Sequence, residues 1–219
     1  AIRVSDYEKN LKQRAKILKE KPEDEVWLET LEKQLSRLSV AISSSRLEVI
    51  MRLAKYLKKP IFNFPEAKVF FKNSIEEKLA NIPALDLEET LSKKYKERRE
   101  IDMILGGSRV GCHKSDLEVI NLQKSLPAHM CSSGEQKSLL ISIIISTAIT
   151  FKEYTKKSPI ILLDEVFTHL DLEKKESLLE ELINLESQVW ITATEKERFL
   201  KNRKSFCYHH LNKSGLENV

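Results

Sequence analysis

Two adjacent acids stand at a point in the sequence where chemistry is expected. The run Pro159-Ile160-Ile161-Leu162-Leu163 is apolar and leads directly into Asp164 and Glu165. Continuous apolar runs are typical of strands buried on both faces, and open α/β sheets bind their ligands beyond the carboxyl ends of such strands. Two neighbouring carboxylates repel each other unless a cation or a reacting water uses them. Because one acid can hold Mg²⁺ while the next orients an attacking water, the pattern favours nucleoside-triphosphate hydrolysis over an acidic helix cap.

A polar turn upstream of these acids has the features of a phosphate-binding helix start. It reads Ser132-Ser133-Gly134-Glu135-Gln136-Lys137 and opens a long apolar segment. Ser132 with Glu135 and Ser133 with Gln136 both have capping-box spacing, which predicts that a helix begins here. Free backbone N–H groups, a serine hydroxyl and the positive end of a helix suit a phosphate, and a glycine lets the ligand approach the backbone. A well-capped core helix that binds no ligand is the alternative.

The phosphate loop that normally accompanies such motifs, G-x-x-x-x-G-K-[ST], does not occur in the 219 residues. The nearest match begins at Gly106 and continues to Gly111, but its lysine, Lys114, comes two residues too late. Charged, helix-like sequence precedes this segment and strand-like sequence follows it, whereas a phosphate loop lies between a strand and a helix. Without a phosphate-loop lysine, we expect the chain alone to bind ATP poorly and to hydrolyse it negligibly.

The elements that would position these motifs divide into two lobes near residue 106, where two glycines interrupt the chain. The first lobe, residues 1–105, is expected to be mainly helical. Apolar residues at helical spacing on either side of a short acidic turn predict an antiparallel helical hairpin, which could be a plain helical subdomain or a protruding coiled coil. The expected elements are helices at 4–18, 28–53 and 85–99 and a small β-hairpin or edge pair of 61–64 with 69–71.

The second lobe, residues 106–219, has the texture of an α/β fold. The expected elements are strands at 116–121, 159–163 and 189–193, helices at 133–151 and 173–185, and a closing strand at 206–211 followed by a turn at 212–215. A strand, a helix and a strand in so short a stretch predict a βαβ crossover with parallel strands. Residues 160–163 should then be the most buried segment, flanked in parallel by the strand at 189–193.

Composition and charge indicate which partners and which cellular compartment suit this chain. A net charge of +4 permits an anionic partner without requiring one. No apolar run reaches the roughly 18 residues of a membrane span and no signal segment opens the chain, so we expect no membrane association. Cys112, Cys131 and Cys207 form no C-x-x-C pair, which is typical of reduced thiols in the cytoplasm.

The motifs resemble those of the RecF family of bacterial recombination mediators. These are ATP-binding-cassette (ABC) ATPases of the DNA-repair branch, which also includes the structural-maintenance-of-chromosomes (SMC) proteins. The resemblance rests on five segments: 6–18, 132–137, 164–165, 168–171 and 192–194. A further segment, 111–117, matches a family G-P-H-R-x-D-L element imperfectly, since cysteine and lysine replace the proline and the arginine. The resemblance implies an incomplete ABC-ATPase lobe, related to phosphate-loop NTPases, behind a helical lobe, without the family's N-terminal phosphate-loop segment.

The resemblance also implies a role for each candidate site residue. Asp164 would hold Mg²⁺, and Glu165 would align the attacking water, so both would be catalytic. Ser133 and Gly134 would contact the γ-phosphate of ATP held by an opposite subunit. The complete set expected to contact the nucleotide comprises the signature residues Ser133, Gly134, Glu135, Gln136 and Lys137, the interface-loop residue Asp171, and the sensor-position residues Thr192 and Thr194.

The function implied is that of a cytoplasmic DNA repair, recombination and replication protein of the SOS response. It would bind DNA at single-strand gaps and junctions, dimerise with ATP, hydrolyse ATP slowly and act with other recombination-mediator proteins. The DNA-contacting residues are not identified by the sequence. Basic side chains of the first helix could face DNA phosphates or line a solvated helix face: Lys9, Lys12, Arg14, Lys16 and Lys19.

Other functions remain open at this point. The chain could be a non-enzymatic interaction fragment that needs a separate phosphate-loop polypeptide, or a degraded gene product. A transporter nucleotide-binding domain is disfavoured by the threonines that follow residues 189–191, where transporter cassettes carry histidine, and by the lack of membrane segments.

Overall fold

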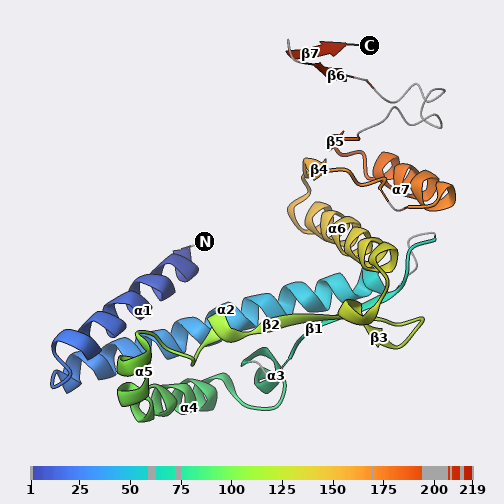
Figure 1. The fold of residues 1–219 in the computed structure, drawn as a ribbon. Coiled ribbons are helices and arrows are strands. Elements are labelled where there is room, and N and C mark those ends of the chain that lie inside the picture. The colour runs from blue at the N-terminus through green and yellow to red at the C-terminus, as the bar shows by residue number, and fades with distance from the viewer. Residues whose placement is uncertain are drawn as a thin grey trace. The chain divides into compact units, whose positions relative to one another are not determined.

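The computed structural model describes residues 2–58, 63–72, 75–168, 170–193, 207, 209–212 and 215–218. The chain divides into two compact units, of which the first comprises residues 1–60 and 65–131 and the second residues 61–64 and 132–219 (Figure 1). The division suggested by the glycines near residue 106 therefore falls inside the first unit. Its physical reason is that the strand after the glycines pairs with a strand that precedes them.

The first unit is built on the expected helical hairpin. Helix α1 (Ile2–Glu20) and helix α2 (Glu25–Leu57) are joined by a short acidic turn, and Asp24 caps α2 by accepting a hydrogen bond from the backbone N–H of Trp27. Side-chain contacts between α1 and α2, such as Asn10 with Gln34, show that the two helices run antiparallel. Three shorter helices follow: α3 (Ile75–Leu79), α4 (Ala84–Glu97) and α5 (Arg99–Leu105).

Arg14 of α1 lies in the interior of this unit. Its side chain donates to Glu32 Oε1 at 3.0 Å, to Asp102 Oδ2 at 2.8 Å and to the carbonyl of Tyr95 at 2.7 Å. The interpretation of Arg14 as a DNA-facing or solvated side chain is therefore wrong. Its helical position, on the same face as Tyr7 and Leu18, carries it into the core, where the two carboxylates neutralise its charge.

A three-stranded antiparallel sheet completes the first unit. Strand β1 (Ala67–Lys72) pairs with β2 (Asp116–Asn121), and β2 pairs with the short β3 (Leu126–Pro127). Two single-turn 3-10 helices, at Cys112–Lys114 and Ala128–Met130, flank the last two strands. The expected hairpin between 61–64 and 69–71 is wrong, because β1 takes its partner from far along the chain. Residues 63 and 64 form a turn, while 61 and 62 lie outside the described residues.

The second unit contains the expected βαβ crossover. Helix α6 (Ser133–Thr155) precedes strand β4 (Ile161–Leu163), helix α7 (Leu172–Asn184) and strand β5 (Val189–Ile191). Strands β4 and β5 are parallel, with Leu163 opposite Ile191. Strands β6 (His209–Asn212) and β7 (Gly215–Asn218) form an antiparallel pair. The closing strand is therefore confirmed at residues 209–211, while residues 213 and 214 of the expected turn lie outside the described residues.

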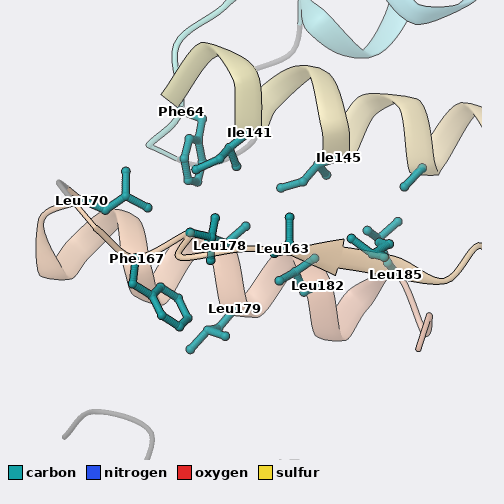
Figure 2. Packing of buried hydrophobic residues seen from close by; sticks show 13 residues of the cluster. Phe64, Ile141, Ile145, Leu163, Phe167, Leu170, Leu178, Leu179, Leu182 and Leu185 are labelled. Atoms are coloured by element: carbon teal, nitrogen blue, oxygen red, sulfur yellow. The ribbon is translucent and has the colours of Figure 1, made fainter. Parts of the chain in front are cut away.

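The core of the second unit lies on one face of the parallel pair. Figure 2 shows Ile141 and Ile145 of α6 pointing toward Leu163 of β4, with Leu178 and Leu182 of α7 beside it. All of these side chains are almost fully buried, as is Phe64. Burying each large aliphatic side chain contributes about 1.5–3 kcal/mol, so this cluster supplies much of the driving force that holds β4 in place.

The other face of the parallel pair is open, which corrects the expectation that residues 160–163 are buried throughout. Ile161 and Leu163 are 5% and 6% exposed, but Ile160 and Leu162 are 66% and 74% exposed, and Trp190 on β5 is half-exposed. Alternate side chains of a strand point to opposite faces. Since α6 and α7 pack against the face of Ile161 and Leu163, the described residues cover the apolar run on one side only.

Two further features of the chain are the state of its cysteines and the hydropathy of its helices. All three cysteines are free thiols, with Cys112 and Cys131 buried and Cys207 exposed. Among the described residues, none of the helices combines the length and the hydropathy needed to cross a bilayer.

Candidate functional site

The two acids lie at the carboxyl end of β4, directly after Leu163. Because β4 and β5 are parallel, Thr192, which follows β5, emerges at the same edge of the sheet. The Thr192 hydroxyl donates a short hydrogen bond to Asp164 Oδ1 and accepts one from the backbone N–H of Glu165 at 3.0 Å. The Thr192 backbone N–H donates to the carbonyl of Leu163 at 3.0 Å. The structure thus brings together three residues that the sequence analysis selected separately.

Glu165 has an unusual backbone. Its φ is +45°, in the left-handed region that residues with a side chain seldom adopt. Its carbonyl accepts a hydrogen bond from Lys137 Nζ at 2.7 Å and another from the Thr168 N–H at 3.2 Å. The side chains of Asp164 and Glu165 are both exposed, so their carboxylates are accessible to ligands from solvent.

The start of α6 carries the signature residues as the sequence predicted. Ser132 is the N-cap residue in an extended conformation, and its predicted capping box with Glu135 is present. Glu135 Oε2 accepts from both the N–H and the hydroxyl of Ser132 at 3.0 Å. Ser133 is exposed on the first turn and Gly134 is half-buried. Backbone N–H groups and the positive end of α6 make this first turn suited to an anion.

Lys137 links the signature turn to the acids. It lies one helical turn after Ser133 on α6, and its ammonium group reaches across to the Glu165 carbonyl at 2.7 Å. Both groups belong to the second unit. The resemblance implies that Lys137 contacts the nucleotide, whereas the spacing of the motifs gives no sign of its contact with the backbone of Glu165.

The remaining candidates are Asp171, Gln136 and Thr194. Asp171 is the N-cap of α7, accepts from the Lys174 N–H at 2.8 Å and forms an ion pair with Lys174 Nζ at 3.0 Å. The Lys174 N–H and then the Lys174 side chain hold the pKa of Asp171 below its usual value. Gln136 occupies the first turn of α6, where its N–H donates to the Ser132 carbonyl. Thr194 lies outside the described residues.

The donor set defines what the site could bind. In the part of the chain that the structure describes, no three His, Cys, Asp or Glu side chains gather as a metal cage. Mg²⁺, however, usually keeps several waters and takes only one or two protein carboxylates together with substrate phosphates. Asp164, with one oxygen bonded to Thr192 and the other without a partner in the described residues, fits that partial role.

Comparison with known proteins places this geometry in context. No family model matches the sequence. The DNA replication and repair protein RecF of Brucella abortus (strain 2308) is 35% identical over 199 residues, which are 90% of this chain and 52% of that protein. RecF of Rickettsia bellii (strain OSU 85-389) is 35% identical over 192 residues, or 88% of this chain and 53% of that protein. The chain thus spans about half the length of the curated relatives it matches.

Solved structures show the same relationship at the level of the fold. A structure of the recombination mediator protein RecF with ATP, in the RecFOR pathway, superposes with a TM-score of 0.78 and 20% identity. A second RecF structure, described as RecF-ATPrS, gives 0.76 and 19%. Each match covers 100% of this chain and 58% of the solved chain. The resemblance to RecF and the fold class drawn from the sequence are therefore confirmed, and the chain is similar to RecF proteins over about half of their length.

Proposed function

We propose that this chain supplies one half of a composite ATPase site in a RecF-like DNA-repair protein. The observation that carries the proposal is the geometry at the carboxyl edge of the parallel pair. Asp164 and Glu165 are exposed there, and Lys137 ties their turn to the helix that begins at the signature residues. Ligands of α/β sheets bind at this edge, and anions bind at helix starts of this kind.

In this proposal each residue has a distinct task. Asp164 would hold Mg²⁺, which when bound neutralises charge on the ATP phosphates. The exposed carboxylate of Glu165 would accept a hydrogen bond from the attacking water and orient it. Ser133 and Gly134 would contact the γ-phosphate of ATP held by an opposite subunit. The phosphate loop and its lysine would come from a different polypeptide segment, since the 219 residues contain no such motif.

The biological setting is proposed from the relatives. Their names describe DNA replication and repair, and recombination mediation in the RecFOR pathway. We therefore propose that the assembled protein dimerises with ATP, binds DNA at single-strand gaps and junctions in the cytoplasm, and uses slow ATP hydrolysis to release it. Other recombination-mediator proteins would be its partners.

The trans role of the signature residues can be tested with a reconstituted complex. The N-terminal segment of the Rickettsia bellii relative, expected to hold the phosphate loop, would be supplied as a separate polypeptide. Ser133→Arg should leave ATP binding by the reconstituted monomer near normal but block ATP-dependent dimerisation, measured by sedimentation of the same sample. Loss of ATP binding and dimerisation together would contradict the trans assignment. Normal dimerisation would contradict the signature role itself.

A second candidate function is non-enzymatic docking, and the open face of the parallel pair favours it. Ile160, Leu162 and Trp190 present apolar surface to solvent, which typically marks an interaction site. On this hypothesis the chain binds a phosphate-loop polypeptide through that face, without turnover. Leu162→Lys should then abolish the association in a pull-down or calorimetry experiment, whereas Ile183→Lys, on the exposed side of α7, should leave it intact. Association unaffected by Leu162→Lys would exclude this face.

A further inference from the structure

The strained backbone of Glu165 is the feature of the second unit that the candidate site does not yet explain. Four residues other than glycine have positive φ in the described part of the chain: Ser125, Lys156, Glu165 and Glu186. Lys156 is the C-cap of α6, a position where the left-handed conformation is common. Glu165 instead is the second residue after the core strand β4. Strained residues persist where the surroundings hold them, and they concentrate at functional sites.

Hydrogen bonds from three separate segments hold Glu165 in this conformation. Its N–H donates to the Thr192 hydroxyl at 3.0 Å, its carbonyl accepts from Lys137 Nζ at 2.7 Å, and the Thr168 N–H donates to the same carbonyl at 3.2 Å. Both polar groups of the Glu165 peptide are therefore fixed from outside the residue. The Lys137 bond is charge-assisted and so is among the stronger kinds.

The single hydroxyl proton of Thr192 decides between two roles for this side chain: contact with a phosphate or support of the two acids. A hydroxyl carries one proton, and that of Thr192 is donated to Asp164 Oδ1. One of its two acceptor lone pairs is used by the Glu165 N–H. Phosphate oxygens accept hydrogen bonds but do not donate them at neutral pH. While the bond to Asp164 is made, Thr192 therefore has no proton to offer a phosphate, and its chemistry fits the holding of the two acids.

We propose that Thr192 and Lys137 are positioning residues that hold the Asp164–Glu165 turn and so aim the Glu165 carboxylate. This inference rests on the proposed function, because the aim of that carboxylate matters only if Glu165 orients a water. It differs from the roles implied by family resemblance, in which both side chains contact the nucleotide. The direction in which a side chain leaves the backbone depends on φ, so loss of either bond would misdirect Glu165 without changing any group that touches ATP.

The first experiment needs no ATPase activity. In the isolated 219-residue chain, hydrogen exchange at the Glu165 amide is followed by NMR. Thr192→Val, which keeps the shape but loses the hydroxyl, should speed this exchange about tenfold, the equivalent of one net hydrogen bond. Thr192→Ser should restore protection. Thr147→Val, which removes a hydroxyl bonded only to its own helix, is the matched control and should leave Glu165 exchange unchanged.

The second experiment uses the reconstituted complex and separates kcat from KM. Thr192→Val and Lys137→Met should each lower kcat about a hundredfold, the order of effect expected of a misplaced catalytic group, with the KM for ATP near normal. Lys152→Met, which removes a lysine bonded to the Leu185 carbonyl, is the control and should change neither parameter. A raised KM at normal kcat, or unchanged Glu165 exchange in Thr192→Val, would overturn the proposal. If the complex shows no turnover at all, the proposed function fails, while amide exchange still tests the positioning role.

Discussion

The two units of this chain use charged side chains in opposite ways. In the first unit, Arg14 is 1% exposed and donates to two buried carboxylates and a carbonyl, so its charge is fully paired. In the second unit, Asp164 and Glu165 are exposed, and Glu165 is held in a strained conformation by bonds from elsewhere. A buried ion must be paired for the fold to tolerate it. Exposed acids on a strained backbone, in contrast, do not stabilise the fold.

The difference separates structural from functional charge. Removing Arg14 or one of its buried partners should destabilise the protein. Any accompanying loss of activity should then follow from the loss of folded protein. Removing the acids should cost little stability and abolish the proposed chemistry. Predictions about the two units therefore have opposite signs, and they test whether this division holds.

The largest expected effect is that of Arg14→Met. The substitution removes a cation shared by the buried carboxylates of Glu32 and Asp102. Arg99 still lies 2.7 Å from Glu32 and Arg98 3.9 Å from Asp102. Because this partial pairing remains, we expect a loss at the lower end of the roughly 3–5 kcal/mol that breaking a buried ion pair costs. Denaturant unfolding of the isolated chain measures it. Lys12→Met, on the exposed side of the same helix, is the matched control and should change stability by less than about 0.5 kcal/mol. Equal effects of the two substitutions would contradict the structural role of Arg14.

Gly111→Ala should have the next largest effect on the first unit. Gly111 has φ +120°, and an added Cβ would lie 2.0 Å from the Tyr7 hydroxyl and 2.5 Å from that of Tyr95. Overpacking of this kind costs about 1–3 kcal/mol, to which the unfavourable φ adds. Gly107→Ala, where a Cβ would meet nothing within 4 Å, is the control. Thermal unfolding of both variants gives the comparison, and a tolerated Gly111→Ala would show that the tyrosines move aside.

In the second unit, a substitution at the strained acid should raise stability instead of lowering it. Glu165→Gly should stabilise the chain by about 0.5–1 kcal/mol, because release of the left-handed strain exceeds the extra entropy that glycine loses on folding. Glu165→Ala keeps the Cβ and should give no such gain. Glu186, with φ +49°, supplies a second control, since Glu186→Gly should be stabilising in the same way without affecting catalysis. Marked destabilisation by Glu165→Gly would mean that the turn is part of the structural core.

The smallest effect concerns pH and the cap of α7. The pKa of Asp171 is lowered by the Lys174 N–H and side chain, so the ionised form is favoured in the folded state. The contribution of ionised Asp171 to folding stability is complete above the unfolded pKa of about 3.9. This contribution is lost as pH falls through the lower folded pKa. Asp171→Asn keeps the cap, because asparagine caps about as well, and should flatten this acid limb. The free energy of unfolding of the unsubstituted chain and of Asp171→Asn, measured between pH 2 and 5, tests this prediction. Identical pH curves for the two proteins would contradict it.

Local pattern was sufficient to predict much of the second unit. The capping spacing of Ser132 and Glu135 placed the start of α6, and the short strand–helix–strand order predicted the parallel pair of β4 and β5. The acids were placed at the edge of the sheet for the same reason. These features depend on neighbours in sequence or on rules of connection that leave few alternatives.

Long-range features could not be predicted in the same way. The pairing of β1 with β2 depends on residues far apart in sequence, and nothing local selects that partner. The apolar run before Asp164 could not show that Ile160 and Leu162 would be left open, because composition does not say how many faces a neighbour covers. The spacing of Arg14 from Tyr7 and Leu18 did carry a signal of burial, but its partners Glu32 and Asp102 lie on other helices.

ATP turnover by the reconstituted complex tests the central claim most directly. The 219-residue chain, the phosphate-loop segment of a relative, and the two together would be compared in magnesium buffer, each also with Glu165→Gln. The proposed half-site predicts turnover only when both parts are present and its loss in Glu165→Gln, with ATP-dependent dimerisation retained. Magnesium-dependent turnover by the 219-residue chain alone, or turnover by the complex that survives Glu165→Gln, would contradict it.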